Sequence, residues 1–183
     1  MPPTTLWYFA YGSNMQTDTF RGRRGIAPLR AVGARVAGWR LVLDKPPLFP
    51  IGESFANVVP DPAAEVFGVA YEIEAADLEH IELTEGVPIG NYRRAEVLAH
   101  LLDDGVAPVS ACTLTSDRHD ASLRPSERYM RLLIEGAREH ALPAEYVAWL
   151  EAVSAQPENP AAAMFRPVLD GLLRSVSRNR RRD

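Results

Sequence analysis

The chain has 183 residues, of which 46% are hydrophobic and 24% are charged, and its formal net charge is -4. This size and balance favour one globular domain with a single core, and the charge argues against nucleic acid as the main partner. No stretch approaches the roughly 20 apolar residues of a membrane span, and "MPPTTLWYFA" lacks the features of a signal peptide. We therefore expect a cytoplasmic protein with no membrane partner, and the oligomeric state stays open.

Cys112 is the single cysteine, so an intramolecular disulfide and a thiolate metal cluster are both excluded. It lies in "VSACTLTS", which has the composition of a strand. A buried, unreactive thiol is the expected state of this residue.

The first two thirds of the chain have the pattern of strands. Aromatic residues at 6–11 predict a first strand, and further strands are expected at residues 37–43, 54–59, 66–73, 95–102 and 109–115. Turn-forming segments separate these runs: "DKPPLFPIGE", "VPDPAAE" and "DDGVAP". The first of them is long and rich in proline, and we expect it to arch over a site.

After residue 120 the pattern becomes helical. Ser126 is a candidate N-cap for a helix with one apolar face, formed by Tyr129, Leu132, Leu133, Gly136, Ala137 and His140. Pro143 begins a second helix, which presents Tyr146, Trp149, Leu150 and Val153, and a third is expected at residues 167–176. The sequence predicts one α+β domain over residues 5–176, followed by a basic tail, residues 177–183, that is too polar to pack.

The segment "EAADLEHIELTEGV" predicts a helix of about three turns that Gly86 terminates. At about 100° per residue, Glu85 falls between Leu78 and Ile81, on the face that turns toward the core. Burial and the negative end of the helix would both raise the pKa of this carboxyl, as a general acid or base requires. A structural glutamate bound to a backbone amide or an arginine is the alternative that the spacing leaves open.

Other catalytic motifs are weak or missing. Ser13 lacks the second glycine of a nucleophile elbow, and the four histidines have no metal-ligand spacing. No phosphate-binding or dinucleotide-binding glycine motif occurs, so we expect neither a metal nor a cofactor. The run "FRGRRG" could hold an anion, but a solvated loop is the stronger interpretation.

The segment "YGSN" at residues 11–14 has a chemical interpretation of its own. Gly12 and Asn14 tolerate positive φ, so successive backbone N–H groups could converge on a carboxylate or an oxyanion. Tyr8 and Tyr11 would add walls with hydroxyl groups. A plain turn at the end of an edge strand is an equally good interpretation of these residues.

In these residues the chain resembles the gamma-glutamylcyclotransferase family. The resemblance is carried by "YFAYGSNM", "SFANVVPDPAAEVFGVAYEI", "LTEGVPIGNYRRAEV" and "PSERYMRLLIEGAREHALPAEYVAWL". The "YGSN" form is similar to the gamma-glutamylcyclotransferase branch rather than to the glutathione-specific or gamma-glutamylamine branches. The resemblance implies a compact mixed β-barrel with flanking helices. It also implies a cofactor-free reaction in which a γ-glutamyl amide yields 5-oxoproline and a free amine or amino acid.

The resemblance also assigns residues. It places the catalytic glutamate on Glu85, a pocket tyrosine on Tyr92, and the loop that holds the glutamyl end on Tyr8, Phe9, Ala10, Tyr11, Gly12, Ser13 and Asn14. The chain departs from its relatives near Thr113, where they can present a tyrosine, and this puts the identity of the substrate in doubt. Removal of a γ-glutamyl protecting group from a biosynthetic intermediate and a non-catalytic metabolite-binding module are the two alternatives.

Overall fold

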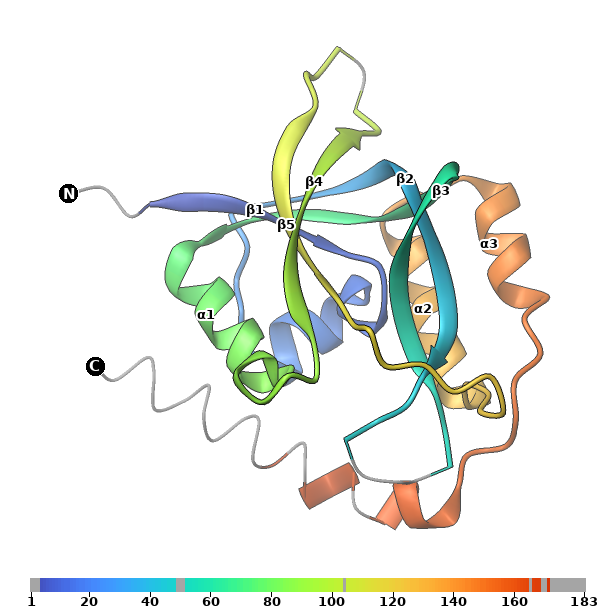
Figure 1. Cartoon of the computed structure of the whole chain (residues 1–183). Helices are drawn as coiled ribbons and strands as arrows, with labels where there is room; N and C mark the ends of the chain where they lie inside the picture. The colour runs from blue at the N-terminus through green and yellow to red at the C-terminus, as the bar shows by residue number, and fades with distance from the viewer. Residues whose placement is uncertain (1–3, 49–51, 104, 165, 169–170, 172–183) are drawn as a thin grey trace.

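The computed structural model describes residues 4–48, 52–103, 105–164, 166–168 and 171, and within them the strands form a closed barrel (Figure 1). The order around the barrel is β1-β3-β2-β4-β5, and only β1 and β5 run parallel to each other. The strands are β1 (Thr5–Ala10), β2 (Arg30–Lys45), β3 (Phe55–Glu74), β4 (Arg93–Leu101) and β5 (Val109–Thr115). The helices are α1 (Ala75–Thr84), α2 (Glu127–Glu139) and α3 (Ala144–Glu151). The expected α+β barrel with flanking helices is confirmed.

The long hairpin of β2 and β3 differs from the sequence prediction. The expected turn at "VPDPAAE" is wrong, because one continuous strand, Phe55–Glu74, takes in both of the strands expected on either side of it. The segment instead forms an irregularity in the ladder, where the partner of Ala37 is Glu65 and the partner of Trp39 is Pro60. Residues of such a bulge need no ladder hydrogen bond, which is why Pro60 and Pro62 are tolerated there.

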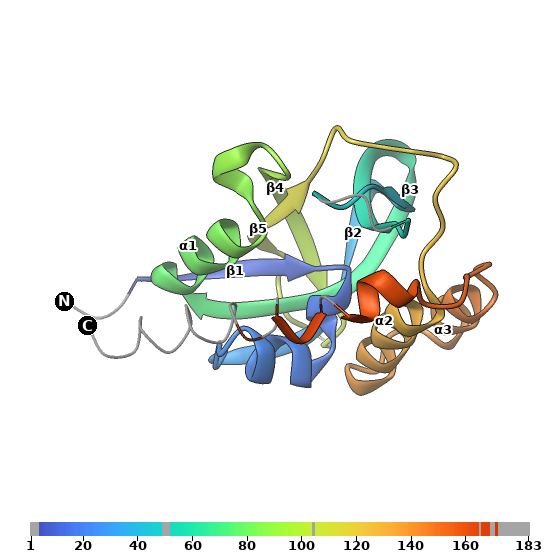
Figure 2. The same ribbon diagram turned by 90° about the horizontal axis from the view of Figure 1, so that it is seen from below.

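The helices match the sequence prediction closely. The Ser126 hydroxyl accepts a hydrogen bond from the Tyr129 backbone N–H, which confirms this residue as the N-cap of α2. Tyr146 and Leu150 of α3 are buried, whereas Trp149, expected on the same face, is exposed. Figures 1 and 2 show α2 and α3 side by side at one end of the barrel and α1 at the other.

The chain after α3 is described only in part. Residues 160–164 and 166–168 are helical, so helical structure begins before the expected start at residue 167. Most of the expected third helix and all of the basic tail lie outside the described residues.

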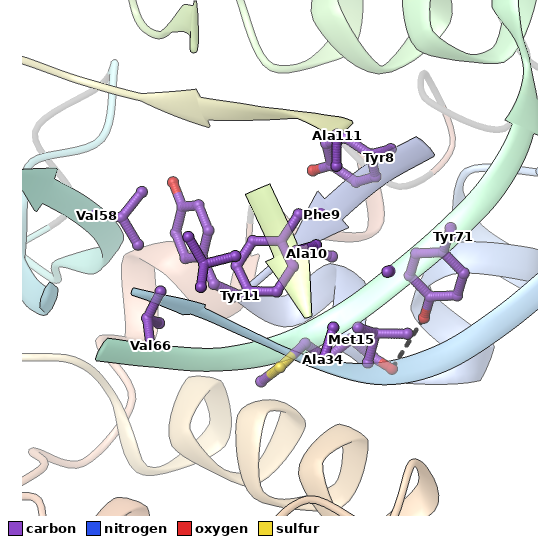
Figure 3. Packing of buried hydrophobic residues seen from close by; sticks show 14 of the residues in the cluster. Tyr8, Phe9, Ala10, Tyr11, Met15, Ala34, Val58, Val66, Tyr71 and Ala111 are labelled. Carbon is purple, nitrogen blue, oxygen red and sulfur yellow. Dashed lines mark hydrogen bonds between the residues drawn. The ribbon is translucent and has the colours of Figure 1, made fainter. Parts of the chain in front are cut away.

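The core fixes the segment that follows β1. Phe20 stacks on Tyr71 with ring centroids 3.9 Å apart. The Tyr71 hydroxyl makes a bifurcated hydrogen bond to the carbonyls of Asn14 and Met15, and Figure 3 shows its bond to Met15. Helix α2 packs directly on the same segment, since a Cβ on Gly136 would lie 2.6 Å from Met15 C. The turn after β1 is therefore held by buried contacts on two sides.

Candidate functional site

A pocket of about 560 Å³ lies where the end of β1, the end of α1, the start of β3 and one face of α2 meet. It takes in most of the residues that the sequence singled out, namely Tyr8, Tyr11, Gly12, Ser13, Asn14, Glu85 and Tyr92. Phe9 and Ala10 do not line it; they lie in the core, and each is about 1% exposed. The proline-rich loop contributes Lys45, Pro47 and Leu48, as expected of a segment over a site.

The turn that follows β1 begins as a short 3-10 helix, Ser13–Met15. The expected positive φ is wrong, because φ of Gly12 is -111° and Asn14 is not among the described residues with positive φ. The turn's own hydrogen bonds start at Met15 N–H, which donates to the Gly12 carbonyl at 3.0 Å. The Ser13 N–H, which precedes it, donates to the Tyr129 hydroxyl, so this turn and α2 are joined at the pocket.

Gly12 is required for a close approach rather than for its backbone conformation. A Cβ at this position would lie 3.1 Å from the Tyr129 hydroxyl oxygen. That hydroxyl also accepts a hydrogen bond of 3.1 Å from the Ala56 N–H. The glycine thus lets α2 place its tyrosine hydroxyl at the floor of the pocket, beside the turn.

Glu85 is positioned by the end of α1. The helix ends at Thr84, Glu85 caps it, and Gly86 has φ of +75°, so the predicted termination is confirmed. The Glu85 side chain is 23% exposed and lines the pocket. Its Oε1 pairs with Arg24 Nη2 and lies 3.4 Å from Asn14 Nδ2. Among the described residues, both side-chain partners of Glu85 contact Oε1, which leaves Oε2 for a substrate.

Arg24 lines the pocket, although the sequence did not mark it as a site residue. The run "FRGRRG" favoured a solvated loop, but Arg24 is only 6% exposed and follows a π-helix, Asp18–Arg23. Its Nε donates to Asn14 Oδ1 and its Nη1 to Thr84 Oγ1, each at 2.6 Å. The guanidinium therefore joins the turn after β1 to the end of α1. Glu85 is thus bound to an arginine, as one of the two interpretations expected, and it also lines the pocket.

Four tyrosines form the aromatic walls of the pocket: Tyr8, Tyr11, Tyr92 and Tyr129. Burial, with the nearby Glu85 charge as the second cause, raises the pKa of Tyr8 to about 12. Burial also raises the pKa values of Tyr11 and Tyr92 well above the usual range of a tyrosine. The pKa of Tyr129 is raised as well, again mainly because of burial. All four hydroxyls therefore stay protonated near neutral pH and act as hydrogen-bond donors as well as acceptors.

A second polar group surrounds Asn91, just after α1. Its Nδ2 donates to the Glu85 carbonyl at 2.8 Å, and its Oδ1 accepts from Lys45 Nζ and Arg118 Nη1, each at 2.9 Å. Lys45 and Asn91 line the pocket. Nothing in the sequence marked these three residues, because they come from three separate segments.

Two expectations near the site have clear outcomes. Thr113 is buried, donates its hydroxyl to the Phe9 carbonyl at 2.9 Å and does not line the pocket. Cys112 is a free, buried thiol as predicted, and burial, followed by the Glu96 carboxyl, raises its pKa to about 11. Within the described residues no group of three or more His, Cys, Asp or Glu side chains could hold a metal ion.

The chain is similar to several known proteins in sequence and in structure. The model of the AIG2-like family matches residues 65–150. The chain is 36% identical over 163 residues to the gamma-glutamyl cyclotransferase aclK of Aspergillus oryzae, and 29% identical over 153 residues to the gamma-glutamylcyclotransferase of Bos taurus. A solved gamma-glutamyl cyclotransferase structure superimposes with a TM-score of 0.74 at 25% identity, and the match covers 84% of this chain and 90% of that one. The chain is therefore similar to gamma-glutamylcyclotransferases in both sequence and fold.

The extent of these matches differs between relatives. The match covers 78% of this chain but 59% of the fungal protein, and 80% of this chain but 77% of the bovine one.

In the part of the chain that the structure describes, no helix is long and apolar enough to cross a membrane.

Proposed function

We propose that the chain is a cyclotransferase that converts a γ-glutamyl amide into 5-oxoproline and a free amine or amino acid. The observation that carries the proposal is a glutamate at the pocket wall, Glu85, whose Oε1 is held by Arg24 and Asn14 while Oε2 is left for a substrate. Relatives named for this activity support it over 78–80% of the chain.

In the proposed reaction, Glu85 takes a proton from the α-ammonium group of the substrate. The ammonium has an ordinary pKa of roughly 8, so the proton must leave before the nitrogen can attack. The amine nitrogen then forms a bond to the γ-carbonyl carbon, and the carbonyl oxygen becomes an oxyanion. When the bond from that carbon to the departing nitrogen breaks, Glu85 returns its proton to that nitrogen. The ring nitrogen still carries a surplus proton, which Glu85 takes and passes to the released amine, so the products are the neutral five-membered ring and an ammonium.

The turn after β1 would hold the glutamyl end of the substrate. The backbone N–H groups of Gly12 and Asn14 would donate to the α-carboxylate or to the developing oxyanion. The protonated hydroxyls of Tyr8 and Tyr11 line the same part of the pocket. Because the ring closure is intramolecular, the protein mainly has to fold the substrate into the attacking geometry.

Release of 5-oxoproline from a panel of γ-glutamyl amino acids, dipeptides and amines tests the proposal. We expect turnover of at least one compound, and a Glu85→Gln variant should lose about 100-fold or more in kcat. Glutamine keeps an oxygen acceptor for Arg24, so this variant should fold. The matched control is Glu79→Gln, at an exposed position of the same helix, which should behave as the wild type. Full activity in Glu85→Gln would overturn the assignment of Glu85.

The same panel separates the two alternatives. Binding of a γ-glutamyl compound without product after long incubation would support a metabolite-binding module. Turnover of a carrier-bound γ-glutamyl intermediate, with none of the free compounds accepted, would support removal of a protecting group. A cytoplasmic location stays a prediction.

A further inference from the structure

The turn that follows α1 is closed by Asn91. Its backbone N–H donates to the Gly86 carbonyl at 2.9 Å, and its Nδ2 donates to the Glu85 carbonyl at 2.8 Å. The Glu85 carbonyl lies at the end of the helix, where backbone carbonyls have no partner within the helix itself. Asn91 therefore holds the peptide unit that carries the Glu85 side chain.

The Asn91 amide is itself fixed in one orientation. Its Oδ1 accepts hydrogen bonds from Lys45 Nζ and Arg118 Nη1, each at 2.9 Å. Ammonium and guanidinium groups can only donate, so the oxygen of the amide must face them. Nδ2 then faces the Glu85 carbonyl, which can only accept. A reversed amide would place its N–H groups against both cations.

Asn91 has little room to move. The residue is 7% exposed, and Ser116 Oγ donates to its backbone carbonyl at 2.8 Å. Gly86 has φ of +75°, and a Cβ on it would lie 3.0 Å from Asn91 Cβ. Because the turn and Asn91 pack so closely, a change at the amide is transmitted to the backbone of Glu85.

The two cations strengthen the hydrogen bond that Asn91 donates. In the ranges that the structure describes, neither Lys45 nor Arg118 lies within ion-pair distance of an acidic side chain. Burial, followed by the Arg118 charge, lowers the pKa of Lys45 to about 8, so the proximity of the two cations is unfavourable by itself. Two positive charges at Oδ1 polarise the amide, and a polarised amide donates more strongly from its nitrogen.

Glu85 is thus held at both of its ends. Arg24 and Asn14 contact the carboxylate, and Asn91 contacts the backbone carbonyl. A carboxylate that moves protons between two nitrogens has to keep its position during the reaction, because a displacement of about 1 Å can cost about 100-fold in rate.

We propose that Asn91 is a positioning residue for the proton transfers of Glu85, and that Lys45 and Arg118 act through its amide. This inference rests on the proposed function and adds to it a residue that acts from the backbone side of Glu85. Its effect is expected in kcat rather than in KM, because the amide holds the group that moves the proton and not the substrate.

Asn91→Asp separates positioning from stability. The new carboxylate keeps two acceptor oxygens for Lys45 and Arg118 and pairs with both charges, so the free energy of unfolding should equal or exceed that of the wild type. It has no N–H for the Glu85 carbonyl. We therefore expect kcat to fall about tenfold, with KM within about twofold of the wild type. Urea unfolding and 5-oxoproline release from the most active compound of the panel measure the two effects.

Asn91→Ser is the second variant, because Asn91→Asp also adds a negative charge near Glu85. The serine hydroxyl is neutral and too short to reach the Glu85 carbonyl, so kcat should fall to a similar extent. Ser116→Ala is the matched control, which removes a hydrogen bond to Asn91 but leaves the amide intact. It should lower the urea midpoint and keep the kcat of the wild type. With each variant assayed where circular dichroism shows it fully folded, a wild-type kcat in either Asn91 variant, or an equal loss of kcat in Ser116→Ala, would overturn the proposal.

Hydrogen exchange tests the same role without turnover. The N–H groups of Ile89 and Gly90 are hydrogen-bonded to carbonyls within the turn. Asn91→Asp should raise their exchange rates by about tenfold, and unchanged rates would overturn the positioning role. Failure of the proposed function has a different signature, which is no 5-oxoproline from any compound with the wild type. The exchange rates then decide by themselves whether Asn91 holds the Glu85 turn.

Discussion

Replacing Arg24 with methionine tests whether this guanidinium holds the site together. The side chain is buried and joins three groups that come from two elements: Asn14 Oδ1, Thr84 Oγ1 and Glu85 Oε1. Methionine keeps most of the apolar stem and removes all of these donors. Glu85 and Asn14 would then lose their shared partner.

The expected cost follows from burial on the two sides of the ion pair. Removing one partner of a fully buried pair costs about 3–5 kcal/mol, because the other charge is left uncompensated. The Glu85 side chain is 23% exposed and can be partly hydrated, which reduces this figure. We therefore expect a loss of about 2–3 kcal/mol in the free energy of unfolding, and a fall of tenfold or more in kcat as the carboxylate loses its fixed position.

Urea unfolding and 5-oxoproline release measure the two effects. Arg21→Met is the matched control, because Arg21 is exposed in the preceding π-helix, and it should lose less than about 0.5 kcal/mol. In the double variant Arg24→Met/Glu85→Gln the uncompensated carboxylate is gone, so part of the stability should return. Equal stability and activity of Arg24→Met and Arg21→Met would refute the reasoning.

Two further predictions concern packing and charge. Gly136→Ala places a Cβ 2.6 Å from backbone atoms of Met15 and Gln16. Gly136→Ala should therefore lower the free energy of unfolding by about 2 kcal/mol and raise KM. Gly22→Ala is the control, because a Cβ there meets no atom within 4 Å, and it should change neither quantity. Equal melting temperatures of the two variants would contradict this reasoning. The lowered pKa of Lys45 means that between pH 8 and 10 the unfolded chain binds more protons there than the folded one. Wild-type stability should accordingly rise by about 2 kcal/mol relative to Lys45→Met over that interval, and a constant difference between the two proteins would rule the shift out.

Local patterns in the sequence were sufficient for the elements that frame the pocket. The end of α1 at Glu85 was predictable because helix periodicity and a following glycine are both short-range signals. The same holds for the Ser126 N-cap and for the strand that leads into the turn at residues 12–14. The single strand β3 was not predictable, since its two prolines resemble a turn until the pairing with β2 is known.

The chemical surroundings of Glu85 were decided by the tertiary structure. Arg24 lies 61 residues away in the sequence, and Lys45 and Arg118 meet at Asn91 from segments 73 residues apart. A charged residue in a polar run has the pattern of a solvated surface, and only its distant partners show that it is buried. The sequence by itself therefore determined which carboxylate and which turn could form a site. The closed barrel determined which cations lie beside them, because those contacts join segments that no local pattern connects.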